Sequence, residues 1–212
     1  MIRVTRSQPA PDCLRLRNSH RCGEVCPRLH QDFLGKCYLC ETPITVGTLE
    51  VDHRNGRSSL ELEFDWNNLF PSCHWCNGQR RRSYPSQLDP TRDEVEVRLI
   101  QWIDQSMCPL FAAALPDDVH AANTAAELTR LHNGAHPRAA DLRGAIVTHL
   151  ARVSLRVMRY RAPSSTANDR QQILAELRWM LGPNAPYSAL VSSSVRACDP
   201  ALWDELDIVQ MG

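Results

Sequence analysis

Two pairs of closely spaced cysteines stand out between residues 37 and 76. Cys37 and Cys40 form the first pair, and Cys73 and Cys76 form the second. A two-residue spacer lets both thiolates of a pair face one ion at roughly 2.3 Å, and two such pairs complete the tetrahedron that zinc prefers. We therefore predict a structural zinc site. Four thiolates leave no open position for water, so any catalysis must come from residues that the zinc holds in place.

Residues suited to hydrolysis of a phosphodiester lie between and beside these cysteines. His53 is the candidate general base, because an imidazole titrates near neutral pH and can take a proton from attacking water. Asp52 and Asn77 offer the oxygen ligands that suit magnesium or manganese, and such a cation would stabilise the leaving alkoxide. Asn68 is the candidate orienting residue, because its amide can both donate and accept hydrogen bonds and so hold the imidazole in one direction.

In order and spacing, these motifs resemble the HNH endonuclease superfamily, whose ββα-metal fold runs strand, loop, strand, helix. The motifs are Cys-Tyr-Leu-Cys-Glu (37–41), Val-Asp-His (51–53), Trp-Asn-Asn-Leu (66–69) and Cys-His-Trp-Cys-Asn (73–77). The resemblance implies that His53 is the base and that Asp52 and Asn77 bind the catalytic metal. It also implies that Asn68 rather than Asn67 takes the middle role, because family members place Leu-x-x-x-Cys directly after that asparagine.

A narrower resemblance is to the HNH subunit of Septu-type anti-phage defence systems. It is carried by Met-Ile-Arg-Val-Thr-Arg (1–6), Gly-Lys-Cys-Tyr-Leu-Cys-Glu (35–41), Phe-Asp-Trp-Asn-Asn-Leu (64–69) and Leu-Asp-Pro (88–90), and covers about half of the chain. It implies an ABC-type ATPase as partner. Members of that family often have Glu, a bulky aromatic residue and a lysine where this chain has Asp52, Arg54 and Arg80 or Arg81.

Other interpretations remain open at the level of sequence. Four cysteines alone are typical of a zinc module that binds DNA or a partner without catalysis, and the same base and cation could instead cleave RNA or tRNA. His74 could replace a thiolate, although both cysteine pairs are complete. The spacing of His20, Cys22, Cys26 and His30 could form a second metal site, but the last three also recur every four residues, as on one helical face, and we expect them to pack.

The distribution of charge limits how the chain could bind nucleic acid. Lys and Arg balance Asp and Glu at 24 each, so the formal net charge is zero, which argues against binding DNA through bulk electrostatics. Basic charge is instead local. We predict phosphate contacts from the arginines that flank the motifs, with a solvated helix end as the alternative for the last three: Arg54, Arg57, Arg80, Arg81 and Arg82.

Composition and length favour a cytoplasmic protein. The 212 residues can bury a substantial core, the N-terminal Met-Ile-Arg-Val-Thr-Arg lacks the apolar stretch of a secretory signal, and no apolar run is long enough to span a membrane. We therefore expect no membrane contact and expect the nine cysteines to be thiols rather than disulfides. Cys13, Cys108 and Cys198 should then pack as small apolar residues.

Periodicity predicts the elements that position these residues. We expect a short strand at 1–6, a helical lead-in within 12–34, and a hairpin at 44–51 that turns at Gly47 and delivers Asp52 and His53. A helix beginning near Cys73 would bring Asn77 beside them. Residues 95–99 alternate as a strand would, with a helix as the alternative, and 118–132, 139–160 and 168–181 show helical spacing.

Together these features predict an α+β protein in three parts. Residues 1–34 would form an N-terminal strand and helical lead-in, 35–90 a zinc-bound HNH nuclease module, and 91–212 a mainly helical C-terminal region. The helical stripes of the last part are most simply core, and a docking surface for the ATPase is the alternative, because the two have the same periodicity.

Overall fold

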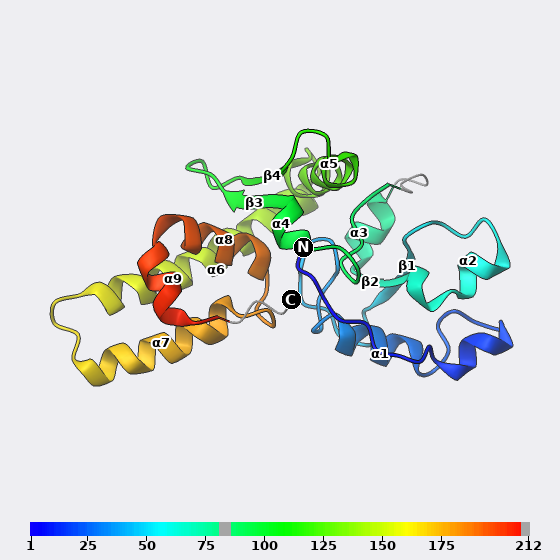
Figure 1. Ribbon diagram of the computed structural model, residues 1–212, viewed down its shortest axis with the longest axis horizontal. Coiled ribbons are helices and arrows are strands. Elements are labelled where there is room, and N and C mark those ends of the chain that lie inside the picture. Colours follow the sequence, from blue (N-terminus) through cyan, green and yellow to red (C-terminus); the bar gives the residue numbers. More distant parts are fainter. Residues whose placement is uncertain (81–85, 209–212) are drawn as a thin grey trace.

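A computed structural model describes residues 1–80 and 86–208 and confirms the predicted α+β class (Figure 1). In chain order, the elements within these residues are η1 (Asp12–Leu16), α1 (Val25–Asp32), β1 (Glu50–His53), α2 (Leu60–Phe64), η2 (Trp66–Asn68), β2 (Leu69–Ser72), α3 (His74–Gln79), α4 (Val95–Arg98), β3 (Leu99–Ile103), β4 (Pro109–Ala113), α5 (Val119–Asn133), α6 (Pro137–Arg161), α7 (Ala167–Leu181), α8 (Ser188–Cys198) and α9 (Pro200–Leu206). The two η elements are 3-10 helices.

The first sheet consists of β1 and β2, which pair antiparallel with His53 opposite Leu69. α3 follows β2 and packs against β1. Cys73 caps this helix, because its Sγ accepts a hydrogen bond from the backbone N–H of Cys76. Two strands and a helix therefore follow one another at the sequence motifs and place Asn77 on the helix beside β1.

The predicted hairpin at 44–51 is wrong. Residues 45–48 form a turn instead, closed by a hydrogen bond from the Thr48 N–H to the Thr45 carbonyl, and the two threonine hydroxyls also contact each other. Only residues from Glu50 onward form a strand, and its partner is the distant β2. A run of β-branched residues shows that a strand is favoured but does not specify the partner with which it must pair.

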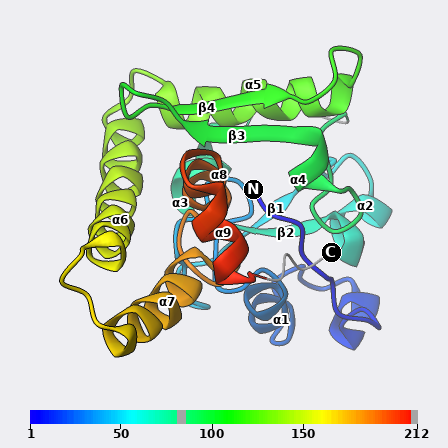
Figure 2. The ribbon, with the colours of Figure 1, turned by 60° about the vertical axis from the view of Figure 1, so that its left-hand side comes forward.

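The second sheet is a hairpin of β3 and β4, and each strand packs against a helix. α5 packs along β4 and α8 packs against β3 (Figure 2). Each alternative for residues 95–99 holds for part of the segment, since Val95 begins the one-turn helix α4 and Leu99 begins β3. Residues 1–6, by contrast, form no strand. They lie as an extended segment in which the Val4 N–H donates to the Pro90 carbonyl.

The three predicted long helices are present as α5, α6 and α7, with breaks close to the expected positions. α6 and α7 pack against each other as neighbouring helices (Figure 1). Leu142, Ile146 and Val153 of the α6 stripe are buried, so this stripe belongs to the core. α8 and α9 were not predicted.

A buried polar network joins the first cysteine pair to α8. The Nζ of Lys36 donates to the Ser188 hydroxyl at 2.9 Å and lies 3.8 Å from the Glu41 carboxylate. That carboxylate also accepts a hydrogen bond from the Ala189 N–H at 3.0 Å. Because buried charges need partners, this network fixes the placement of the first cysteine pair relative to α8.

The cysteines outside the two pairs differ from expectation. Cys13 of η1 and Cys22, in the segment before α1, form a disulfide, so the prediction of thiols only is wrong for these two residues. Their Cα atoms lie 6.1 Å apart because the chain folds back between the two helices, a closeness that no spacing rule reveals. Cys22 is therefore not free to join Cys26 in a second metal site. Cys198 is exposed rather than packed.

Among residues 1–80 and 86–208, no helix is both long and apolar enough to cross a membrane.

Candidate active site and metal centre

The four motif cysteines meet at one point. Their sulfurs all lie within 4.8 Å of one another, and the Sγ atoms of Cys40 and Cys73 are 3.8 Å apart. A regular tetrahedron with zinc–sulfur bonds of about 2.3 Å has edges of roughly 3.8 Å. Burial raises the pKa of the Cys37 thiol, which disfavours a free thiolate there, and a divalent cation would reverse this effect. The donor set and its geometry fit a structural metal such as zinc.

Hydrogen bonds in the backbone shape the first cysteine pair and attach it to the sheet. The Glu41 N–H donates to the Cys37 carbonyl at 2.9 Å, and the Tyr38 N–H donates to the Pro71 carbonyl of β2 at 3.0 Å. Since β2 leads directly to the second pair, the two pairs approach each other because the loop of the first is bonded to the strand before the second.

His53 ends β1, and its side chain is held by the chain that follows. Its Nε2 lies 3.1 Å from the backbone carbonyl oxygen of Glu63. A carbonyl can only accept, so Nε2 carries the hydrogen and Nδ1 of the neutral ring keeps a lone pair. Burial lowers the pKa of His53 to about 4. The imidazole is therefore neutral at pH 7 and able to accept a proton through Nδ1.

Asn68 is fully buried and ties together the loop between His53 and α2. Its Nδ2 donates to the carbonyl oxygens of Gly56 at 2.9 Å and Leu62 at 2.7 Å. Its Oδ1 accepts from the Asn55 N–H at 2.7 Å. Leu62 precedes the residue whose carbonyl holds the His53 ring, so the Asn68 amide braces that carbonyl as well as the loop.

Asp52 is 6% exposed, and its carboxylate accepts hydrogen bonds from two donors. Its Oδ2 accepts a hydrogen bond from the Tyr38 hydroxyl at 2.6 Å and forms an ion pair with Arg80. Burial raises the pKa of the Asp52 carboxyl, whereas both donors favour its charged form. Among the described residues, Asn77 forms its side-chain hydrogen bond with Glu50 and not with Asp52. Its Nδ2 donates to the Glu50 carboxylate at 2.6 Å.

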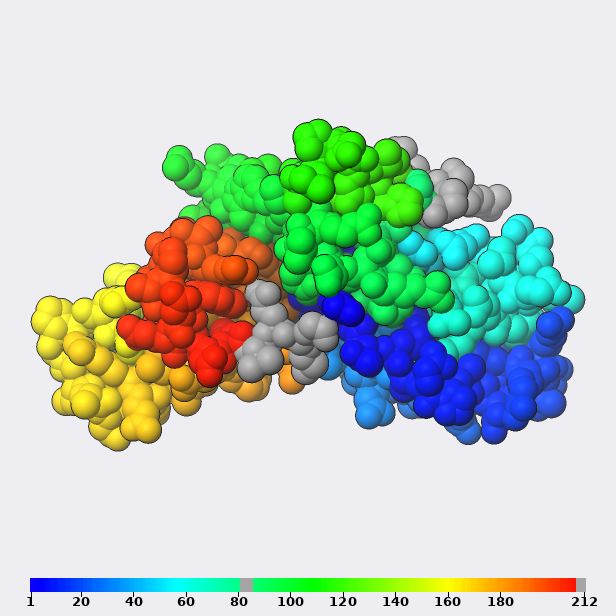
Figure 3. All heavy atoms as spheres, viewed as in Figure 1, coloured from blue at the N-terminus to red at the C-terminus, as the bar shows by residue number. Residues whose placement is uncertain are grey.

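One open cleft of about 800 Å³ collects Asp52, His53 and Asn77. Its walls are β1, the loop after it, the α3 side chains, and His20 and Arg21 from the N-terminal segment. Figure 3 shows how the blue N-terminal residues lie beside the cyan residues that follow β1. Asn68 lies behind the loop rather than in the cleft wall.

The predicted arginines differ in what they can reach. Arg57 is exposed and lines the cleft. Arg54 and Arg80 also line it, but their side chains are only 11% and 7% exposed, and Arg54 donates to the Gln87 carbonyl. Arg81 and Arg82 lie outside the described residues. Arg57 is thus the predicted arginine with the freest access to a phosphate in the cleft among those that the structure describes.

Three other residues of the cleft lie outside the predicted nuclease site. His20 lies edge-on to His53, with ring centroids 4.7 Å apart, and burial is the main cause that lowers its pKa. Arg21 follows it and donates to the Leu49 carbonyl at 3.0 Å. Glu50 could have been found, because side chains two residues apart on a strand share a face and Asp52 was already a candidate.

His74 is not part of the cysteine cluster. Its side chain is 93% exposed, and its Nδ1 lies 2.7 Å from the Glu50 carboxylate. The four-cysteine group is complete without it.

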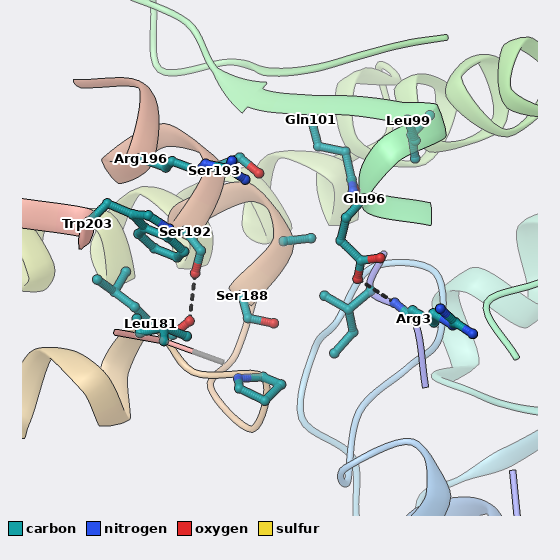
Figure 4. A pocket seen from close by; sticks show the side chains of 14 residues that line it. Arg3, Glu96, Leu99, Gln101, Leu181, Ser188, Ser192, Ser193, Arg196 and Trp203 are labelled. Atoms are coloured by element: carbon teal, nitrogen blue, oxygen red, sulfur yellow. Dashed lines mark hydrogen bonds between the residues drawn. The ribbon is translucent and has the colours of Figure 1, made fainter. Parts of the chain in front are cut away.

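A smaller cavity, of about 90 Å³, lies away from this chemistry between the N-terminal segment, β3, α8 and α9 (Figure 4). Two polar groups at its wall are paired. Ser192 donates to the Leu181 carbonyl, and the Arg3 N–H donates to Glu96. The described residues that line it include no histidine or cysteine. The cleft at β1 is therefore the better candidate for an active site.

Comparisons with models of protein families, with curated proteins and with solved structures found no match to this chain.

Proposed function

We propose that this protein is a metal-dependent endonuclease of the HNH type that hydrolyses phosphodiester bonds in DNA. The observation that carries the proposal is the state of His53. Its Nε2 is tied to a backbone carbonyl, its Nδ1 keeps a lone pair, and it lines one cleft with Asp52 and Asn77. That arrangement suits a base that activates water beside a cation.

In this proposal, His53 Nδ1 takes a proton from a water molecule as that water attacks the phosphorus. Burial keeps the ring neutral before the step, and the Glu63 carbonyl stabilises the imidazolium after it through the Nε2–H bond. Asn68 keeps that carbonyl and the loop in place. Arg57, at the open side of the cleft, would bind a phosphate of the substrate.

The donor set of the cleft fits magnesium or manganese. Asp52 and Asn77 provide oxygen atoms, which these hard cations prefer. The Oδ2 of Asp52 already accepts hydrogen bonds from Tyr38 and Arg80, so Oδ1 is the oxygen that would face the cation. When bound, the cation would neutralise charge on the phosphate and stabilise the leaving alkoxide.

The zinc would act on structure rather than on chemistry. Cys73 caps α3 and Cys76 lies within it, so an ion held by both cysteine pairs would fix the helix that carries Asn77. Loss of zinc should then disturb the cleft without removing any group that reacts.

We extend the proposal to a cytoplasmic anti-phage complex with an ABC-type ATPase. This part rests on the Septu resemblance. The chain has no net charge, so bulk electrostatics and counterion release would contribute little to holding DNA. The partner would supply that binding and would restrain cleavage until infection.

The decisive experiment is cleavage of plasmid DNA and of total RNA by the purified chain with magnesium or manganese, with and without a co-purifying ATPase. We expect DNA cleavage that is lost in His53→Ala and kept in His120→Ala, a control at an exposed histidine on α5. Cleavage of RNA but not of DNA would show that RNA is the substrate. No cleavage of either would favour a non-catalytic zinc module that binds DNA or a partner.

A further inference from the structure

Glu50 links the first strand of the cleft to α3. One carboxylate oxygen lies 2.7 Å from His74 Nδ1, and the other accepts from Asn77 Nδ2 at 2.6 Å. The Glu50 side chain lines the same cleft as Asp52 and Asn77.

A carboxylate decides how a neighbouring amide must point. The two ends of an asparagine amide differ, one being a donor and the other an acceptor, and in this structure the Nδ2 end of Asn77 donates to the Glu50 carboxyl group. The NH₂ group of Asn77 must therefore face Glu50. Its Oδ1, which is the only side-chain atom able to bind a cation, is then directed away from Glu50.

Without this constraint, the Asn77 side chain could rotate by half a turn at little steric cost, because the two ends of an amide have almost the same size and shape. The rotated form would present NH₂ to a cation and could not bind it. The choice between a ligand and a non-ligand thus depends on what the other end of the amide contacts.

We propose that Glu50 is a positioning residue that holds the carbonyl oxygen of Asn77 toward the catalytic cation. The inference rests on the proposed function, in which Asn77 is a ligand of that cation. Partners that orient metal ligands typically change metal affinity by about 10- to 100-fold when they are removed. Glu50 acts here through Asn77 and does not itself bind the cation.

The test measures manganese binding to the zinc-loaded full chain by electron paramagnetic resonance, without substrate. We expect Glu50→Ala and Asn77→Ala each to weaken binding about tenfold or more. The double variant should bind manganese as tightly as Asn77→Ala does. If Glu50 acts only through Asn77, its removal has no effect once Asn77 is gone. His74→Ala is the matched control, since it removes the other partner of Glu50, and it should bind manganese like the unchanged chain.

Additive losses in the double variant would overturn the inference and make Glu50 a ligand in its own right. Unchanged binding in Glu50→Ala would also overturn it. The proposed function would survive both results if cleavage still depends on His53. If the unchanged chain binds no manganese, the proposed cation and the inference fail together. Equal zinc content in all variants shows that the fold is retained.

Discussion

Asn68 offers the sharpest test of how the loop after β1 is held. We predict that Asn68→Ala lowers both stability and activity, whereas Asn67→Ala leaves both nearly unchanged. The two asparagines are adjacent but differ in their contacts. Asn68 makes three hydrogen bonds to the backbone, while the side chain of Asn67 makes a single bond to Asp65 at 3.3 Å in an exposed setting.

The expected loss of stability follows from the groups left without a partner. Asn68→Ala leaves one backbone N–H and two backbone carbonyl groups without a hydrogen-bond partner. Each unsatisfied buried group costs about 1–3 kcal/mol. Gly56 and Leu62 are only half-buried and Asn55 is exposed, so water can replace part of each bond and the lower end applies. The sum is about 3 kcal/mol, which corresponds to a fall in Tm of roughly 6–12 °C for a chain of this size.

The expected loss of activity comes from the His53 ring. When Asn68 no longer braces Leu62, the neighbouring carbonyl that holds Nε2 can move, and a displacement near 1 Å can cost about 100-fold in rate. Thermal unfolding followed by circular dichroism and single-turnover cleavage of plasmid DNA would measure both effects. The smallest expected difference in Tm between Asn68→Ala and Asn67→Ala is roughly 6 °C, and a difference of only about 1–2 °C would refute this account of the loop.

Three further predictions concern the zinc, the base and Asp52. Cys40→Ser should lose zinc and folded structure together, as measured by metal analysis and circular dichroism, and an unchanged zinc content would contradict the four-thiolate site. Because burial lowers the pKa of His53 to about 4, the active neutral ring should persist as pH falls below 6.5, and kcat/KM should drop only as pH approaches 4. An acid limb centred near 6.5 would show that the ring is not buried as described. The same depressed pKa of His53 also affects the free energy of unfolding. His53 does not reduce it above pH 6.5, where the ring is neutral in both states, and reduces it as pH falls from 6.5 toward 4. Tyr38→Phe removes the hydroxyl that donates to Asp52 and should cost about 1 kcal/mol of stability, measured by urea unfolding, and an equal midpoint would argue against that bond.

Features set by short-range spacing could be predicted from sequence. The helices α5, α6 and α7 follow a repeat of apolar residues, which depends only on neighbours three and four positions apart. The four cysteines were found in the same way, because a two-residue spacer is enough to aim two thiolates at one ion. The helix after Cys73 was predicted to bring Asn77 beside Asp52 and His53, and all three residues line one cleft.

Features that depend on distant partners were decided only by the tertiary structure. The strand at Glu50 pairs with Leu69–Ser72 rather than across Gly47, and Cys13 meets Cys22 because the chain folds back. His20 faces His53 for the same reason. The available tautomer of His53 and the direction of the Asn77 amide depend on one acceptor each, the Glu63 carbonyl and the Glu50 carboxylate. The sequence by itself therefore determined which chemical groups are present, whereas their hydrogen-bond partners, and so the atoms left to react, required the folded chain.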